Sequence, residues 1–336
     1  MIEHPLLNTK TPYKNLEPQL ILDAIESIGI RCNGSLLALN SYENRVYQVG
    51  IEEEAPLIAK FYRPYRWSDD AILEEHQFAM ELARQEIPVV PPLELMNTTL
   101  HVFQNFRFAL FPRQGGRALE LDNAEHLAWM GRFIGRLHVI GAAQTFHHRR
   151  GLNVETYGHQ AFQYLLENDF IPTDIRQIYC HAVNDVLQKV AQTFEQAEPI
   201  KLIRLHGDCH AGNVLWNDQG PRIVDLDDCL TGPAIQDMWM LLSGGNSEER
   251  RAQLYQLLDG YEQFYDFNYR EINLIEALRT LRMIHYSAWL ARRWEDPAFP
   301  LNFPWFNTRR YWEEQLQHIR EQSQLLDEGN EGAYSL

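Results

Sequence analysis

The sequence feature that most constrains the fold is a polar segment between two short, mostly apolar runs. Leu202–Leu205 and Arg222–Val224 have the length and composition of buried strands. Between them the chain places Asp208 and Asn213, and Asp225 directly follows the second run. A loop that only faces solvent is not expected to lie directly between two strand-like apolar runs. The segment therefore predicts a polar site held at the ends of buried strands.

These side chains suit phosphoryl transfer to a hydroxyl. In that reaction a carboxylate orients the hydroxyl and accepts its proton, and we assign this role to Asp208. Mg²⁺ takes oxygen ligands, typically one or two carboxylates with substrate phosphates, and Asn213 and Asp225 offer such oxygens. Asp227 and Asp228 could extend the metal site, although such neighbours more often bond the loop itself.

The histidines and cysteines of the segment allow other interpretations. His206 and His210 have a spacing that could serve zinc. Two nearby glycines indicate a loop and not a helix, so His206 is expected to bond the loop backbone. Cys209 and Cys229 are expected to be small buried side chains, with a redox role as the alternative.

The N-terminal part of the chain predicts an antiparallel sheet followed by a helix. Strands are expected at Leu36–Leu39, Arg45–Val49 and Leu57–Tyr62, joined by short polar turns. Ser68 with two acids directly after it is typical of a helix start, and this helix is expected to reach about Gln85.

One acid in that helix needs a partner. Ile72, Glu75, Ala79 and Leu82 fall on one helical face, which places a carboxylate among apolar side chains. A lone acid there is costly unless it is paired, and Lys60 on the preceding strand is the expected partner. The alternative is that Glu75 lies at the boundary and faces water.

The pattern changes near residue 112, which predicts two lobes. Strands are expected at Leu93–Leu95, Thr99–Phe103 and Phe106–Phe111 before the break at Pro112–Arg117. A first helix is expected at Pro18–Ile28, and the later ones at 124–140, 154–168, 174–192, 235–243, 247–265, 270–294 and 308–327. The fold class expected is α+β and bilobal, with a small β lobe at 1–112, a large helical lobe at 113–336 and a hinge at about 111–115.

Composition limits the partners. The chain has 336 residues and a formal charge of −16, which argues against nucleic acid because phosphates would be repelled. Its four cysteines form no CxxC pair, and no apolar stretch approaches the roughly 20 residues of a membrane span. Met1–Pro5 lacks the features of a signal peptide. A monomeric cytoplasmic protein is expected.

The central segment resembles a known superfamily. His206-Gly207-Asp208-x-x-x-x-Asn213 followed by Val224-Asp225 is similar to the catalytic and metal-binding pair of the aminoglycoside phosphotransferase and choline kinase group, relatives of the protein kinases. Gly135–His138 resembles the helix that precedes this motif in the group, and Asp237 resembles a later aspartate that bonds back to the catalytic loop.

The resemblance also assigns the nucleotide site. Lys60 and Glu75 match the lysine and glutamate that pair to hold ATP phosphates. Phe111 and Arg113 fall in the linker that receives adenine. The resemblance therefore implies a kinase fold with ATP and Mg²⁺.

Longer segments resemble the bacterial stress response kinase A family, which are serine/threonine protein kinases. They are Leu39–Tyr47, Lys60–Pro64, Glu74–Phe78, Asp225–Asp228, Gly232–Asp237 and Asp296–Pro300. This resemblance implies protein substrates, a role in stress response, and an ATP contact from Ser41. This chain differs from protein kinases in two places. Its turn at Asn40–Asn44 has no glycine triplet, and Asp225 is followed by Leu226-Asp227.

Two other functions remain open from the sequence. A small-molecule kinase for choline-like or aminoglycoside substrates is one, because aromatic residues at 289–306 could cage a quaternary ammonium. These aromatics are Trp294, Phe299, Phe303, Trp305 and Phe306, and the preferred interpretation is that they pack the C-terminal helices. The other is a non-catalytic binding module on a kinase fold, which the presence of Lys60, Asp208, Asn213 and Asp225 disfavours.

Overall fold

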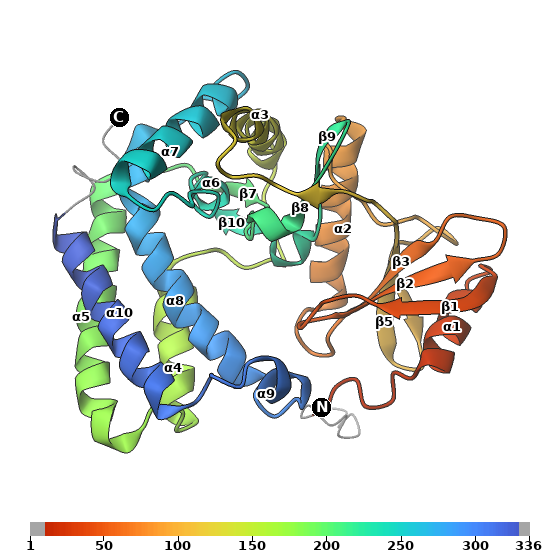
Figure 1. Cartoon of the computed structure of the whole chain (residues 1–336), viewed down its shortest axis with the longest axis horizontal. Coiled ribbons are helices and arrows are strands. Elements are labelled where there is room, and N and C mark those ends of the chain that lie inside the picture. Colours follow the sequence, from red (N-terminus) through yellow and green to blue (C-terminus); the bar gives the residue numbers. More distant parts are fainter. Residues whose placement is uncertain (1–10, 329–336) are drawn as a thin grey trace.

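The computed structural model describes residues 11–328, so the expectation about Met1–Pro5 lies outside the described residues. A small lobe built on an antiparallel sheet lies beside a larger, mostly helical lobe (Figure 1). The predicted fold class is confirmed. Among residues 11–328, no helix has both the length and the apolar character needed to cross a bilayer.

The small lobe contains a five-stranded sheet in the order β1-β2-β3-β5-β4. Its strands are β1 Cys32–Ala38, β2 Arg45–Ile51, β3 Leu57–Phe61, β4 His101–Phe103 and β5 Phe106–Pro112. Lys60 lies on the central strand β3, opposite Val46 of β2 and Ala109 of β5. The strand predicted at Leu93–Leu95 is wrong: Leu93 N donates to Leu110 O at 2.7 Å, but the chain reverses at Met96 and Asn97, both with positive φ, so Leu95 forms only an isolated bridge to Thr98.

Two helices complete this lobe. α1 (Pro18–Glu26) buries Ile21, Ala24 and Ile25 in a cluster that also contains strand residues of the sheet. α2 (Asp69–Arg84) begins at Ser68, whose Oγ accepts a hydrogen bond from Ala71 N at 3.1 Å. α2 lies between the sheet and the large lobe in Figure 1, so its buried face can carry a side chain into the interlobe space.

The large lobe holds most of the helices predicted for it. The helices of this lobe are α3 Ala124–Gly141, α4 Gln160–Glu167, α5 Thr173–Ala197, α6 Gln236–Trp239, α7 Ser247–Tyr261, α8 Ile275–Arg292, α9 Ala298–Asn302 and α10 Arg309–Glu328. α4 follows a π-helical turn, η1 (Val154–His159), and α8 follows a 3₁₀ segment, η4 (Tyr269–Leu274). α6 is much shorter than the helix predicted at 235–243, and α9 was not predicted.

Short strands surround the central polar segment. β7 (Ile203–Leu205) pairs with β10 (Leu230–Gly232), and β6 (Arg117–Ala118), β8 (Val214–Asn217) and β9 (Gly220–Ile223) form a second small sheet. The strands predicted on either side of the segment are confirmed as β7 and β9. Val90 N donates to Ile223 O at 3.1 Å, so β9 also ties the segment to the chain that links α2 to β4.

Candidate active site

A cavity of about 1340 Å³ lies between the lobes and collects the predicted site residues. The predicted residues that line it are Ser41, Lys60, Glu75, Phe111, Asp208, Asn213 and Asp225. Arg113 does not line the cavity, so its predicted role in the nucleotide site is wrong. Its side chain is exposed and donates from Nε to Gln48 Oε1 at 2.7 Å, because the chain after β5 directs residue 113 towards β2 and not into the cavity.

Lys60 connects the small lobe to the acids of the large lobe. Its Nζ lies 3.3 Å from Glu75 Oε1, 2.9 Å from Asp225 Oδ1 and 3.3 Å from Asp227 Oδ1. Glu75 is only 3% exposed, so the predicted ion pair is confirmed and the alternative of a boundary residue in water is wrong. Burial alone would lower the pKa of Lys60, but these three carboxylates hold it well above its usual value.

Glu75 shows the cost of placing this pair inside the protein. Burial raises the pKa of Glu75 to about 7, even though the Lys60 ammonium acts in the opposite direction. The lysine stays charged, because three carboxylates surround its ammonium group.

The loop before Asp208 is fixed by one buried carboxylate. Asp237, fully buried on α6, accepts hydrogen bonds from His206 N and Gly207 N, both at 2.8 Å. This confirms the prediction that Asp237 bonds back to the loop. His138 of α3 lies 3.2 Å from the same carboxylate through Nε2. Gly207 has φ +84°, and a Cβ there would lie 2.2 Å from Asp228 O, so only glycine fits this turn.

Asp208 is held by two cationic or hydrogen-bonding side chains. Arg282 of α8 donates from Nη1 to Asp208 Oδ1 at 2.7 Å, and His210 Nε2 lies 3.4 Å from Oδ2. Burial would raise the pKa of Asp208, but His210 and Arg282 hold it well below its usual range. The side chain is therefore an ionised acceptor. His206 bonds Val224 O through Nε2 at 3.0 Å, which confirms its backbone-bonding role.

Asn213 and Asp225 are positioned by the ends of β8 and β9. Asn213 Nδ2 donates to Asp208 O at 3.0 Å, and Val224 N donates to Asn213 O at 3.0 Å. Within the described part of the chain, Asn213 Oδ1 receives no hydrogen bond. Asp225 has φ 60° and a side chain that is 53% exposed, so the backbone turns left-handed to present its carboxylate to the cavity.

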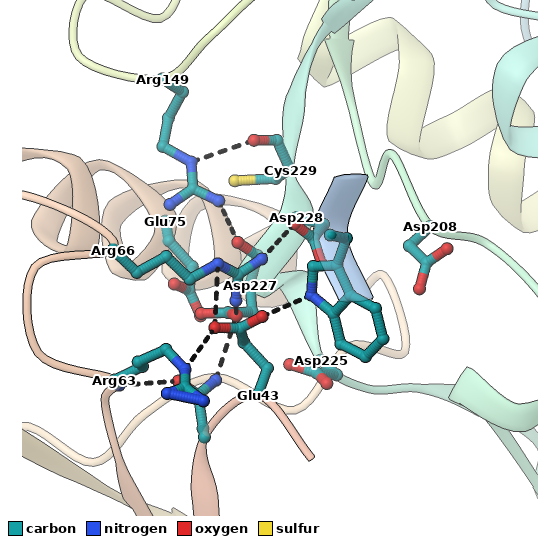
Figure 2. Close-up of polar contacts among 12 residues, drawn as sticks. Glu43, Arg63, Arg66, Glu75, Arg149, Asp208, Asp225, Asp227, Asp228 and Cys229 are labelled. Atoms are coloured by element: carbon teal, nitrogen blue, oxygen red, sulfur yellow. Dashed lines mark hydrogen bonds and ion pairs between the residues drawn. The ribbon is translucent and has the colours of Figure 1, made fainter. Parts of the chain in front are cut away.

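A cluster of arginines fixes the residues after Asp225, and the sequence alone did not reveal it (Figure 2). Arg66 pairs with both Asp227 and Asp228, and Asn44 Nδ2 donates to Asp227 Oδ2 at 3.0 Å. Arg149 donates to the backbone carbonyls of Asp227 and Cys229. The Asp227 side chain is 3% exposed and is engaged by Asn44, Lys60 and Arg66 of the small lobe, so it supports the site from behind Asp225.

Glu43, in the turn that replaces a glycine-rich loop, joins the two lobes. Its carboxylate lies 3.1 Å from Arg63 Nε and 2.7 Å from Arg293 Nε, and it accepts a hydrogen bond from Trp289 Nε1. Burial would raise the pKa of Glu43, but Arg66, Arg293 and Arg63 lower it to about 2. The sequence contains one sign of this contact, which is the pair of arginines, Arg63 and Arg66, shortly after Lys60. Spacing alone does not identify the partners of these arginines.

The two cysteines near the site are buried. Cys209 is 1% exposed and Cys229 is 0% exposed, and burial raises the pKa of both thiols. Thiols in such surroundings are poor nucleophiles, which agrees with the interpretation that they are small packing residues.

Comparisons with known proteins agree with this geometry. Residues 35–275 match the model of the phosphotransferase enzyme family. The chain belongs to this family. Stress response kinase A of Escherichia coli strain K12 is 44% identical to this phosphotransferase over 321 residues, which cover 96% of this chain and 97% of the relative. The serine/threonine protein kinase RdoA of Salmonella typhimurium is 44% identical over 316 residues, 94% of this chain and 95% of that protein.

A solved structure with the same fold is that of the amicoumacin kinase hAmiN in complex with AMP-PNP and Ca²⁺. It superposes with a TM-score of 0.70 at 19% identity and covers 92% of this chain and 93% of that chain. At this identity the likeness concerns the fold. The two-lobed architecture of this phosphotransferase is thus that of known kinases.

Proposed function

We propose that this phosphotransferase is a protein kinase that transfers the γ-phosphate of ATP to serine or threonine hydroxyls. The observation that carries the proposal is near full-length identity of 44% to proteins named stress response kinase A and serine/threonine protein kinase RdoA. Lys60, Asp208, Asn213 and Asp225 all line one cavity, which supports it. The role in bacterial stress response rests on those names, and a monomeric cytoplasmic state remains an expectation.

The small-lobe side of the cavity suits ATP. Val46, Ile58 and Phe111 line it with apolar surface, which fits an adenine ring. Lys60 supplies a charged donor for phosphate oxygens, held in place by Glu75. Ser41 lies in the turn above and donates from Oγ to Asn44 O at 3.0 Å, so this turn has an ordered shape without a glycine triplet.

The donor set at the end of β9 fits Mg²⁺. Asn213 Oδ1 is free of hydrogen bonds from described residues, and Asp225 presents an accessible carboxylate. These are hard oxygen ligands of the kind that Mg²⁺ takes together with substrate phosphates. When bound, Mg²⁺ neutralises charge on the phosphates. Asp227 and Asp228 are engaged by Arg66, so we assign the metal to Asn213 and Asp225.

Asp208 acts on the hydroxyl of the acceptor. Its carboxylate orients the hydroxyl and accepts the proton as the acceptor oxygen bonds to the γ-phosphorus and the bond to the β–γ bridging oxygen breaks, releasing ADP. The low pKa of Asp208 keeps it ionised across the physiological range. With this low basicity its main contribution is orientation, which suits a loose transition state with little need for an early proton transfer.

The structure gives little support to a cage for a quaternary ammonium because, of the aromatics at 289–306, Trp289 and Phe303 line the cavity and the others do not. Of the five aromatics named for it, only Phe303 lines the cavity. Phe299 and Phe306 are 0% and 1% exposed, and Trp294 packs edge-on against Phe306 with ring centroids 5.0 Å apart. These rings join α8, α9 and α10, as the preferred interpretation expected. A choline-like small-molecule kinase is therefore the weaker candidate.

A substrate comparison tests the proposal. The full chain is incubated with Mg²⁺ and labelled ATP, with a generic protein in one arm and choline or an aminoglycoside in the others. Label in protein, and loss of that label in Asp208→Asn, is the expected result. Rapid labelling of a small molecule with none in protein would contradict the proposal.

A further inference from the structure

The part of the cavity beyond Asp208 carries several cationic side chains, and two of them have no role in the phosphoryl-transfer chemistry. Arg282, His285, Trp289 and Arg292 recur along α8 at intervals of three or four residues, so they share one helical face, and all four line the cavity. Arg150, in the loop after α3, lines the same cavity. The acceptor side of the cleft is therefore basic, although the whole chain has a formal charge of −16.

The acids that line the cavity are already paired. Glu43 contacts Arg63 and Arg293, and Glu75 contacts Lys60. The remaining acidic contacts are Asp225 with Lys60, Asp227 and Asp228 with Arg66, and Asp208 with Arg282. By contrast, Arg150 and Arg292 form no ion pair with any residue between 11 and 328; their guanidinium groups lie over the rings of Trp67 and Tyr164, at 4.8 Å each. These are the cations left for a ligand.

The electrostatics agree with a site that lacks its counter-charge. Burial lowers the pKa of Arg292, and the charge of Arg150 lowers it further. His285 has its pKa lowered to about 3 by burial and then by Arg150, Arg292, Arg293 and Arg282. Guanidinium groups around one cavity repel one another, and a bound anion would relieve this repulsion. The imidazole of His285 stays neutral, stacked on Tyr157 of η1 with ring centroids 4.3 Å apart.

We propose that Arg150 and Arg292 form a subsite that binds an anionic group of the acceptor, a carboxylate or a phosphate on a residue near the phosphorylated hydroxyl. This rests on the proposed function and adds the substrate class: serine or threonine in an acidic or already phosphorylated peptide context. Guanidinium groups are suited to either anion, because their planar donors can form paired hydrogen bonds to two oxygens.

The spacing along α8 favours a peptide. Ten residues separate Arg282, which contacts Asp208, from Arg292, and a helix of that length spans about 15 Å. An extended peptide advances about 3.3 Å per residue. The anion is then expected within about five residues of the acceptor hydroxyl, too far for a substituent on the same side chain.

The experiment uses the full chain, Mg²⁺ and labelled ATP with a peptide set that contains one serine in a neutral background. An aspartate is placed at each position from five residues before to five after the serine, with asparagine and lysine peptides as matched controls and a phosphoserine arm at the preferred position. We expect aspartate at one or two positions to raise kcat/KM about tenfold or more over asparagine, since a hydrogen bond to a charged group is typically worth that much. The phosphoserine arm distinguishes the two sources of the anion.

Variants assign the preference to the subsite. Arg292→Gln and Arg150→Gln are expected to reduce the ratio of kcat/KM for aspartate over asparagine peptides, and Arg292→Glu to favour the lysine peptide. Arg310→Gln is the matched control, because the Arg310 side chain is 86% exposed on α10, away from the cavity lining, and pairs with Glu314. Thermal unfolding of each variant confirms that it is folded.

The outcomes distinguish a failure of the anion subsite from a failure of the proposed kinase function. Peptide phosphorylation with equal kcat/KM for aspartate, asparagine and lysine, or an aspartate preference that survives both glutamine variants, overturns the subsite and leaves the kinase function standing. Absence of transfer to every peptide and protein contradicts the proposed function itself.

Discussion

Lys60 Nζ lies 2.9 Å from Asp225 Oδ1, so an ammonium group on the central strand of the small lobe contacts a carboxylate at the end of β9 in the large lobe. The same ammonium contacts Glu75 of α2 at 3.3 Å. One side chain thus connects the sheet, the helix that lies between the lobes and the proposed metal ligand. Its removal affects both the nucleotide site and the charge balance of the cavity.

Lys60→Met is expected to lower kcat/KM for ATP by about 10- to 100-fold, the effect of losing a charge-assisted hydrogen bond to phosphate. It also leaves Glu75 buried without its cation, which costs stability. Lys60→Met combined with Glu75→Gln should recover the urea midpoint without recovering ATP use. Normal ATP kinetics in the single variant would contradict the role of the lysine.

Asp208→Asn is expected to slow phosphate transfer by about 10²- to 10⁴-fold, because the neutral amide orients the acceptor hydroxyl poorly and cannot accept its proton. Binding of a non-hydrolysable ATP analogue, measured by calorimetry, should change little, since Asp208 lies on the acceptor side. Asp218→Asn, in the exposed β8–β9 turn, serves as the control and should transfer phosphate at the normal rate. Equal transfer rates in the two variants would rule out Asp208 as the acceptor-orienting group.

Asp237→Asn is expected to destabilise the fold by about 2 kcal/mol. The two carboxylate oxygens each accept a backbone N–H at 2.8 Å, and an asparagine can replace only one of these acceptors while its amide group faces the other donor. Urea unfolding measures the loss, with Asp259→Asn on the exposed face of α7 as the control. An unchanged midpoint for Asp237→Asn would show that these bonds do not hold the loop.

The contact of Glu43 with the arginines predicts a pH dependence of stability. The pKa of Glu43 falls from 4.5 to about 2 on folding, so the unfolded chain binds more protons between these values and stability rises with pH. The contribution, about 3 kcal/mol, is present above roughly pH 5 and is lost as the pH falls towards 2. Glu43→Gln should therefore lower the unfolding free energy at pH 7 and have a smaller effect at pH 3.5. The same effect at both pH values would contradict this assignment.

Much of the fold was predictable because its elements have simple patterns. The β-prone sequence at Arg45–Val49 lies between polar turns, and the apolar face of α2 has a period of about 3.6 residues. The Lys60–Glu75 pair followed from the cost of an unpaired acid on that face. The Leu93–Leu95 strand failed because the chain reverses at Met96 and Asn97, and α6 ends at Trp239, before the end predicted for it.

The contacts that shape the site could not be predicted from the sequence. Arg66 and Asp227 are separated by 161 residues, and Arg282 and Asp208 by 74. Charged side chains on loops have no period, so their partners depend on how the two lobes meet. For the same reason Arg113 was misassigned: it follows β5 directly, and the direction of its side chain depends on the neighbouring strand β2.

The central claim is that this chain phosphorylates protein hydroxyls with Asp208 as the orienting carboxylate. The most direct measurement is mass spectrometry of a generic protein after incubation with the full chain, Mg²⁺ and ATP. Phosphoserine or phosphothreonine formed by the natural sequence and absent with Asp208→Asn is the predicted result. Phosphorylation that is unchanged in Asp208→Asn, or no phosphorylated protein under conditions where a small-molecule alcohol is phosphorylated, would contradict the claim.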